Sequence, residues 1–170
     1  RTSLFNFDNK FKVSVTGIDP ETDRLDQLVY YTDGSSFQGR TGAGVYCAQN
    51  DLGISYSLGR TSSIFQAEVH AINTCVNVMF DHCTSGQTIF IRSDSQAALK
   101  ALDSPATTSR LIAETIERLN VLAEDNSVTL QWIRGHAGNI GNETVDRLAK
   151  IGAKLEFVGP APAIGCSVDF

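Results

Sequence analysis

Three short hydrophobic segments, separated by polar or glycine-rich stretches, open the main part of the chain. Their β-branched, aromatic and apolar residues predict strands over residues 28–32, 42–48 and 53–58. The connections between them, residues 34–41 and 49–52, are short. Because short connections join antiparallel strands, the pattern predicts an antiparallel meander.

A helical period then replaces the strand pattern. Five apolar residues recur every three or four positions: Phe65, Val69, Ile72, Val76 and Met79. The spacing predicts a helix over about residues 64–80, with Ser62 or Ser63 as its N-cap. Glu68 lies on the same apolar stripe, where an acid is out of place in a plain amphipathic helix.

The rest of the chain alternates strands and helices. The predicted elements are a strand over residues 88–93, helices over 95–102 and about 109–124, a strand over 128–133 and a helix over about 142–153. A strand that follows a crossover helix in the same sheet normally runs parallel to the earlier strand. The sequence therefore predicts an α/β domain with a mixed five-stranded sheet, in which two parallel strands follow three antiparallel ones.

The chain of 170 residues fits one domain, which we place at residues 27–153. Residues 1–26 lack a clear hydrophobic period and are interpreted as a leader or linker docked on this domain, with a candidate short strand at 11–15. Residues 154–170 are interpreted as a tail or linker, because they include the proline- and glycine-rich stretch 159–165.

Composition narrows the class of protein. Hydrophobic residues make up 42% and charged residues 19% of the chain, which is typical of a globular protein. No apolar run approaches the roughly 20 residues that span a bilayer, and the first residues show no signal-peptide pattern. The four cysteines lack CxxC spacing, and Cys47 and Cys75 lie in apolar contexts that favour core thiols. We therefore expect an intracellular protein of the cytoplasm or nucleus, reduced and without a zinc site.

The chain is acidic, with a net charge of −5 and a pI of about 5.1. This balance argues against a protein that binds nucleic-acid phosphates unaided, since such binding needs lysine and arginine. Any nucleic-acid function must rest on a few local basic residues, on metal ions or on a tethered partner domain.

Four acids stand out by their positions. Asp33 interrupts the first strand and Glu68 lies on an inward helix face, while Asp94 follows the strand 88–93 and Asp146 borders the apolar stripe of the last helix. Three have ordinary interpretations: Asp33 as the first residue of an Asp-Gly turn, Asp94 as an N-cap, and Asp146 as an i,i+4 partner of Lys150. Together they are harder to explain, because the carboxyl ends of adjacent parallel strands meet at one crevice and clustered carboxylates repel each other.

Divalent cations would stabilise such a cluster. Oxygen ligands without histidine or cysteine suit Mg²⁺ or Mn²⁺. Two such ions roughly 3.5–4 Å apart activate a water molecule and stabilise the leaving oxygen in phosphodiester cleavage. The acids therefore point to a two-metal site.

The motifs around these acids resemble the successive signatures of type 1 ribonuclease H. They are Tyr31-Thr-Asp-Gly-Ser35, Gln66-Ala-Glu68, Ser93-Asp-Ser-Gln96 and the stretch WIRGHAGNIGNETVDRLA from Trp132 to Ala149. The resemblance covers about residues 28–153, and the four motifs occur in the family's order, each on the expected element. It implies the family's fold and the cleavage of the RNA strand of RNA/DNA hybrids. It also implies two bound Mg²⁺ ions, for which Mn²⁺ can substitute.

The resemblance also implies roles for single residues. Asp33, Glu68, Asp94 and Asp146 are expected to hold the two ions, with Asp33 bridging both and Asp146 on the second. His136 matches the family's loop histidine, whose ordinary pKa suits proton transfer or product release near neutral pH. The alternative is an exposed loop histidine without a role. The other two histidines lack such a context and are interpreted as surface residues.

Weaker matches suggest contacts with the substrate. Ser35 and Gln96 match family positions that lie near the hybrid, where contacts to the 2′-OH separate RNA from DNA. Glu143 matches a family glutamate near the metals, and a salt bridge with Arg147 is the alternative. Three hydroxyl side chains are equally suited to hold a DNA phosphate or to cap a helix: Ser63, Thr107 and Thr108.

Two features depart from the family. Several members carry Asn-Gln, which contacts the minor groove, where this chain has Ile64-Phe65. The basic, tryptophan-rich handle of some members is absent between residues 102 and 109. The first departure puts part of the hybrid-recognition set in doubt but not the chemistry. The missing handle leads us to expect weak binding by the isolated domain.

Residues 63–69 and 157–163 are also similar to the ribonuclease H segment of non-LTR retrotransposon polyproteins. This second resemblance implies a larger protein with a reverse transcriptase domain, which would deliver the substrate to an acidic domain. Two other hypotheses are a catalytically weak or inactive hybrid-binding module that scaffolds a polymerase, and a nuclease of the same fold for double-stranded RNA or DNA. The complete set of acids disfavours the first, and the Gly-His-Ala-Gly loop disfavours DNA recombination.

Overall fold

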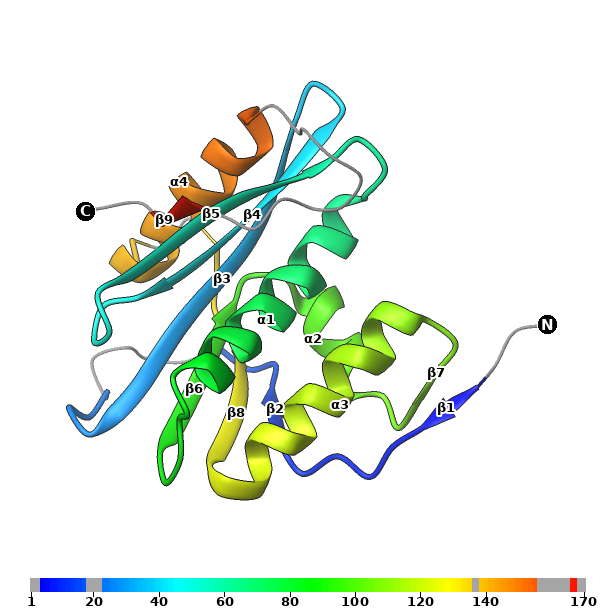
Figure 1. Ribbon diagram of the computed structural model, residues 1–170, viewed down its shortest axis with the longest axis vertical. Helices are drawn as coiled ribbons and strands as arrows, with labels where there is room; N and C mark the ends of the chain where they lie inside the picture. The colour runs from blue at the N-terminus through cyan, green and yellow to red at the C-terminus, as the bar shows by residue number, and fades with distance from the viewer. Residues whose placement is uncertain (1–3, 18–22, 136–137, 156–165, 168–170) are drawn as a thin grey trace.

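A mixed β-sheet forms the centre of the fold in the computed structural model, which describes residues 4–17, 23–135, 138–155 and 166–167 (Figure 1). The helices of this described part are α1 (Ile64–Asp81), α2 (Gln96–Asp103), α3 (Arg110–Asp125) and α4 (Ile140–Lys154). The strands of the sheet are β2 (Lys12–Ser14), β3 (Gln27–Phe37), β4 (Arg40–Cys47), β5 (Leu52–Gly59), β6 (Thr88–Ser93), β8 (Ser127–Trp132) and β9 (Cys166–Ser167). A separate two-stranded pair consists of β1 (Phe5–Asn6) and β7 (Ala106–Thr107). The predicted α/β fold is confirmed.

The strand order of the sheet is β2-β8-β6-β3-β4-β5-β9. β3, β4 and β5 form the predicted antiparallel meander, and β6 and β8 add to it in parallel with β3. The sheet has seven described strands where five were predicted, because β2 pairs with β8 at one edge and β9 pairs with β5 at the other. Both additions are edge strands of two or three residues, too short for a hydrophobic period to reveal. β2 coincides with the candidate strand at 11–15.

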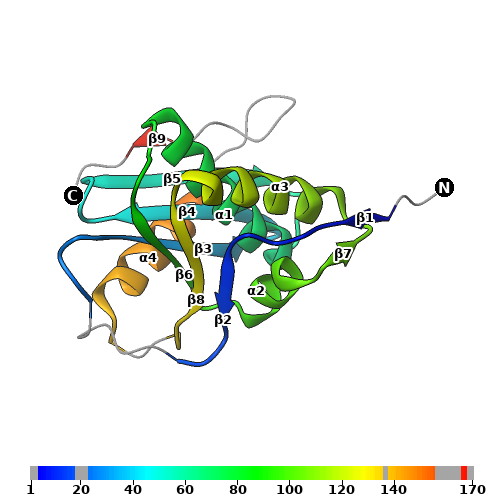
Figure 2. The same ribbon diagram turned by 90° about the horizontal axis from the view of Figure 1, so that it is seen from below.

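Helices cover both faces of the sheet. α4 packs against β3, β4 and β5, and α1 packs against β3 and β4 and against α3 (Figure 2). Tyr30 belongs to the large core beneath α1 and α3, whereas Val29 and Tyr31 belong to a smaller cluster with Val145 of α4. Because both faces are covered, β3 reads as a continuous apolar run rather than an alternating one.

β3 is longer than predicted and runs through Asp33. Its pairing with β4 continues from Tyr31 to Phe37, and the chain turns only at Gln38 and Gly39, which have φ angles of 49° and 76°. Two successive positive φ angles are the geometry of a tight two-residue hairpin whose twist matches that of its strands. The alternative interpretation of Asp33 as the first residue of an Asp-Gly turn is therefore wrong, and Asp33 lies within the strand.

Helix starts follow the capping chemistry of serine and asparagine. Ser63 caps α1 and forms a capping box with Gln66. Ser95 caps α2 through a hydrogen bond from the Ala98 N–H at 3.2 Å, so the interpretation of Asp94 as a cap is wrong. The Asn139 side chain accepts from the N–H of residue 142 at 2.9 Å, and α4 begins earlier than predicted.

Several smaller expectations can also be compared with the structure. Cys47 and Cys75 are buried free thiols, as predicted. No helix in the described residues is both long and apolar enough to cross a membrane. His82 is exposed, but the surface interpretation of His70 is wrong: it is half-buried, and its Nδ1 lies 2.7 Å from the Tyr56 hydroxyl.

Candidate active site

Three carboxylates from different elements meet beside the sheet. Asp33 lies in β3, Glu68 lies in α1, and Asp94 directly follows β6. β3 and β6 are parallel neighbours that pair Tyr31 with Arg92, so the acids two residues later, Asp33 and Asp94, lie side by side. One carboxylate oxygen from each acid lies within 4.8 Å of the others. The structure thus brings together three of the four acids that the sequence singled out.

Gly34 permits the close approach of α1 to β3. A Cβ at this position would lie 2.8 Å from the Glu68 nitrogen and 2.9 Å from the Ala67 Cβ, closer than such atoms pack. Its N–H also donates to Asp33 Oδ1 at 2.9 Å. The Asp-Gly pair therefore positions Glu68 against Asp33 rather than forming a turn.

Burial and mutual repulsion dominate the electrostatics of the cluster. Asp33 is 3% exposed and Glu68 is 5% exposed. Burial raises the pKa of Asp33 far above its ordinary value, and the neighbouring carboxylates raise it further. Burial likewise raises the pKa of Glu68, and the negative charge of Asp94 is the second largest cause that raises it. Without a cation, the cluster therefore resists full ionisation at neutral pH.

The donor set fits a hard divalent cation. Glu68 Oε2 is buried and has no hydrogen-bond partner among the described residues, although a buried carboxylate oxygen is costly to leave unpaired. Among the described residues, the group that meets here consists of carboxylates and includes no histidine or cysteine. Such ligands favour Mg²⁺ or Mn²⁺ over softer metals.

Asp146 lies at the rim of the cluster. Its charge contributes to the raised pKa values of Asp33 and Glu68, but it is outside the group that meets within 4.8 Å. Its Oδ2 forms an ion pair with Lys150 Nζ at 2.7 Å, one turn along α4. The ordinary interpretation of Asp146, an i,i+4 ion pair with Lys150, is thus present in the structure.

The loop after β8 passes directly over Asp94. A Cβ on Gly135 would lie 3.1 Å from Asp94 Oδ2, so a side chain at this position would crowd the carboxylate. His136 follows but lies outside the described residues, and its role stays a prediction. Glu143 is exposed in the first turn of α4, and none of the described ion pairs joins it to Arg147.

Trp132 supports the cluster from behind, a role that its motif did not suggest. Its indole N–H donates to the Asp94 carbonyl oxygen at 3.1 Å, and the Ile133 N–H donates to the Ser93 carbonyl oxygen at 3.0 Å. These bonds fix the backbone at the end of β6, from which the Asp94 carboxylate projects. Trp132 is therefore a positioning residue.

Arg92 forms a second support that sequence reasoning missed. It is 2% exposed, and it donates to Asp23 Oδ2 at 2.7 Å, to the Tyr31 hydroxyl at 3.0 Å and to Gln131 at 3.0 Å. A Cβ on Gly141 would lie 2.2 Å from the Tyr31 ring, so this ring packs directly on the start of α4. The only available signal was an arginine at the end of an otherwise apolar strand, TIFIRS.

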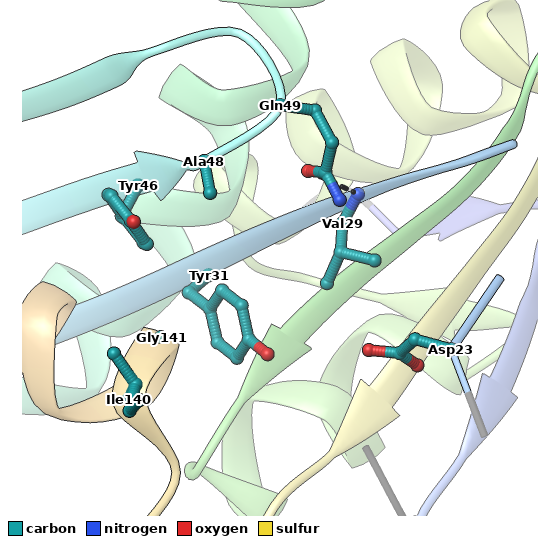
Figure 3. A pocket seen from close by; sticks show the side chains of 8 residues that line it. All are labelled: Asp23, Val29, Tyr31, Tyr46, Ala48, Gln49, Ile140 and Gly141. Carbon is teal, nitrogen blue, oxygen red and sulfur yellow. Dashed lines mark hydrogen bonds between the residues drawn. The ribbon is translucent and has the colours of Figure 1, made fainter. Parts of the chain in front are cut away.

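An open cavity of about 220 Å³ lies beside this support (Figure 3). Asp23, Tyr31, Tyr46 and Gln49 line it together with the start of α4 at Gly141. Because the Asp23 carboxylate is held by an arginine, it does not add an unpaired charge to the cavity. The cavity separates α4 from the β4–β5 turn on the face opposite α1.

The candidate substrate contacts have mixed surroundings. Ser35 is half-buried in β3, two residues after Asp33, and Gln96 is half-buried as the first residue of α2. Ser63 caps α1, which was its alternative role. Thr107 is not a helix cap, because Ser109 caps α3, and the Thr107 hydroxyl accepts from the Ser109 N–H at 3.1 Å. Three further residues of interest are exposed: Thr108, and Ile64 and Phe65 at the start of α1.

Comparison with known proteins identifies similar chains. The sequence profile of the RNase H family matches residues 26–154. The ribonuclease H of Schizosaccharomyces pombe is 33% identical over 147 residues, which are 75% of this chain and 53% of that protein. The ribonuclease H of Methylorubrum extorquens is 34% identical over 90 residues, 46% of this chain and 40% of that protein. The ribonuclease HI of Pasteurella multocida is 27% identical over 155 residues, 80% of this chain and 97% of that protein.

The chain thus spans about half or less of the first two relatives and nearly all of the third. Among solved structures, RNase H1 from the halophilic archaeon Halobacterium salinarum has a similar fold, with a TM-score of 0.58 and 21% identity. That match covers 74% of this chain and 96% of the archaeal one. At this level of identity the likeness supports the fold.

Proposed function

The chain belongs to the ribonuclease H family, and from this premise we propose that it is a metal-dependent endonuclease that hydrolyses the RNA strand of RNA/DNA hybrids. The observation that carries the proposal is the meeting of Asp33, Glu68 and Asp94 within 4.8 Å, with one buried oxygen of Glu68 unpartnered. A purely structural cluster would pair that oxygen with a donor, since an unpaired buried acceptor costs about 1–3 kcal/mol.

We assign the four acids to two divalent cations: Asp33, Glu68 and Asp94 would hold them where the three carboxylates meet, and Asp146 would contribute from the rim of the cluster. Two such ions supply the charge that activates the attacking water and stabilises the leaving oxygen. The raised pKa values of Asp33 and Glu68 support this assignment, because a cation relieves the repulsion that raises them. Mg²⁺ is the proposed ion, with Mn²⁺ as a substitute.

The protein's own groups orient this chemistry. Trp132 holds the backbone of Asp94 through its carbonyl oxygen, the Gly135 backbone lies against the Asp94 carboxylate, and Gly34 lets Glu68 approach Asp33. We propose His136 for proton transfer or product release beside the metal-binding acids. Ser35 and Gln96 are proposed to contact the hybrid backbone and 2′-OH groups, and Glu143 to adjust the second metal position.

We also propose that the domain belongs to a retrotransposon polyprotein with a reverse transcriptase. The support is the similarity of residues 63–69 and 157–163 to such proteins, together with the missing basic handle between residues 102 and 109. A tethered polymerase domain would hold the hybrid near a site that binds it weakly, because tethering raises the effective concentration.

The test is a cleavage assay with end-labelled RNA/DNA hybrid, double-stranded RNA and double-stranded DNA. Each substrate is incubated in Mg²⁺, in Mn²⁺ and in EDTA with the wild-type domain and with Asp94→Asn, which keeps the side-chain shape but removes the charge. We expect metal-dependent cuts confined to the RNA strand of the hybrid, and none with the variant.

Cleavage of double-stranded RNA or DNA would contradict the proposed substrate. If wild-type protein binds the hybrid at high micromolar concentration without cutting it in either metal, the proposal of an active enzyme fails and the scaffold alternative takes its place.

A further inference from the structure

The charge of this acidic chain is unevenly distributed. α3 carries four acids, Glu114, Glu117, Glu124 and Asp125. Five cations instead gather along α4 and around the turn between β3 and β4, and we refer to them as the basic edge: Arg40, Arg60, Arg147, Lys150 and Lys154. The net charge of −5 is therefore a poor guide to this side of the molecule.

Three cations of the basic edge form a row on α4. Arg147, Lys150 and Lys154 are all exposed, and their spacing of three and four residues places them on one face of the helix. The row begins at the metal-binding acids, because Lys150 Nζ lies 2.7 Å from Asp146 Oδ2. At 1.5 Å per residue, it extends along the helix for roughly 10 Å.

The C-terminal end of this row lies beside the β3–β4 turn, where Arg40 and Arg60 add two further cations. Lys154 Nζ lies 5.2 Å from the centre of the Phe37 ring, and Phe37 pairs with Arg40 across the hairpin. Arg60 Nη1 donates to the carbonyl oxygen of Gln38 in the turn at 3.2 Å. Figure 1 shows the end of α4, the β3–β4 turn and the β5–α1 connection at the same end of the molecule.

Most of these charges are not neutralised within the protein. Apart from Lys150, no cation of the basic edge takes part in an ion pair among the described residues. Lys154 and Arg60 are held by an aromatic ring and a carbonyl oxygen, contacts that orient a cation but leave its charge available to an anion.

The geometry relates this surface to the cleavage site. Phe37 lies four positions after Asp33 in β3, a distance of roughly 13 Å at about 3.3 Å per residue. With a rise of about 3.4 Å per base step, the far end of the basic edge lies roughly four base pairs from the bond that the carboxylates would cleave.

We propose that the basic edge binds the sugar–phosphate backbone of the nucleic-acid substrate, away from the cleaved bond. This inference rests on the proposed function, since it takes the carboxylate cluster as the position of one phosphate. A row of cations that continues from that position matches a row of phosphates in charge and direction. An acidic protein can in this way attract a polyanion to one side while its other surfaces repel it.

The test measures binding in a background that does not cleave. All proteins carry Asp94→Asn, and their affinity for a fluorescent RNA/DNA hybrid is measured by anisotropy in Mg²⁺ between about 50 and 200 mM salt. The test variant adds Arg60→Gln, Arg147→Gln and Lys154→Gln, three exposed positions outside the carboxylate cluster.

The matched control removes three cations from the N-terminal part of the chain. Lys10→Gln, Lys12→Gln and Arg24→Gln change the net charge by the same amount, and all three side chains are exposed. Thermal unfolding of each variant verifies folding, since exposed substitutions usually change stability by less than about 0.5 kcal/mol.

Each lost phosphate contact lowers the slope of log affinity against log salt by about 0.7–0.9. We expect the slope of the test variant to be smaller in magnitude than that of the parent by about 2–3. Between the lowest and the highest salt concentration, the affinity of the parent should therefore drop by a factor roughly 20 to 40 times larger than the drop for the test variant. The control should keep the parent slope. If the test variant and the control variant have equal slopes, the proposal is overturned. The basic edge would then bind a different partner, such as an acidic protein segment.

This result is separable from the proposed function. If the wild-type domain fails to cleave the hybrid but the slopes differ as expected, the basic edge is a binding surface and the proposed activity is wrong. If it cleaves the hybrid and the slopes are equal, the activity stands and the basic edge does not contact the substrate.

Discussion

Asp33→Asn should stabilise the metal-free protein while removing its metal site. Burial and the neighbouring carboxylates raise the pKa of Asp33 in the folded chain above its value in the unfolded chain. Protons therefore bind the folded state more tightly, so the contribution of this group to stability is fully present below about pH 4 and is lost as the pH rises through the raised pKa. Asparagine keeps the side-chain shape without the charge, and its amide can donate to the unpaired oxygen of Glu68.

The structure limits the size of the effect. About three pKa units separate pH 7 from the ordinary aspartate pKa, and each is worth about 1.4 kcal/mol, so the largest penalty is about 4 kcal/mol. Asp94 is half-exposed, which lets water and counterions screen one side of the cluster. We expect Asp33→Asn to recover about 1–3 kcal/mol, which for a chain of this length raises Tm by roughly 2–12 °C.

The assay is thermal unfolding at about pH 5 and about pH 8, in EDTA and in millimolar Mg²⁺. Asp8→Asn, at an exposed position, controls for the loss of one charge. In EDTA the gain from Asp33→Asn should be larger at the higher pH. In Mg²⁺ it should shrink or reverse, because the ion stabilises the wild-type fold by mass action and binds the variant poorly.

Two results would refute this reasoning. If Asp33→Asn raises Tm in EDTA by the same amount at both pH values, the ionised carboxylate of Asp33 does not destabilise the fold. If Mg²⁺ stabilises Asp33→Asn as much as the wild type, Asp33 is not a ligand of the ion, and the assignment of the cluster as a metal site loses its central member.

Two further substitutions test the supports of the site, and a third tests the half-buried His70. Gly34→Ala should lower the free energy of unfolding by about 1–3 kcal/mol and weaken Mg²⁺ binding, because its Cβ would lie 2.8 Å from the Glu68 nitrogen. The control is Gly17→Ala, whose Cβ has room, and it should change neither quantity in the same unfolding and titration experiments. Trp132→Phe should lose about 1 kcal/mol and roughly tenfold in Mg²⁺ affinity by calorimetry, and unchanged affinity would refute its positioning role. Burial, and then a nearby arginine, lower the pKa of His70, so its contribution to stability is present above about pH 6.5 and is lost as the pH falls. Urea unfolding should show the wild type losing stability over this range relative to His70→Gln, and parallel curves would contradict the assignment.

Hydrophobic periods predicted the fold well because most elements bury a regular face. α1 and α3 carry apolar stripes that pack into one core, and no predicted bound of either helix differs from the observed one by more than one residue. The predictions were wrong where hydrogen-bonded pairing between strands, rather than a local pattern, sets the end of an element. Asp33 and Gly34 have turn propensity, but β4 supplies partners as far as Phe37, and this long-range pairing outweighs the local preference.

The site shows the same division between local pattern and tertiary contact. The acids could be found from the sequence because each interrupts a pattern: Glu68 a helical stripe and Asp94 the end of a strand. Trp132, Arg92 and Gly34 could not, because their roles depend on distances across elements. An indole that holds a carbonyl oxygen and a glycine that admits a helix look, in sequence, like ordinary members of a strand.

Net charge says little about any one surface for a related reason, since it sums over positions that the fold separates. A value of −5 argued against a domain that binds nucleic-acid phosphates unaided and left such binding to a few local basic residues, to metal ions or to a tethered domain. Folding brings Arg40, Arg60 and Lys154 to one end of the sheet, although long stretches of sequence lie between them, and it places the acids of α3 on another element. Because screened charges act over only about 8–10 Å at physiological salt, a polyanion at the basic edge responds mainly to these cations. The acidic composition therefore excludes a uniformly basic nucleic-acid binder but does not exclude one that binds along a single edge.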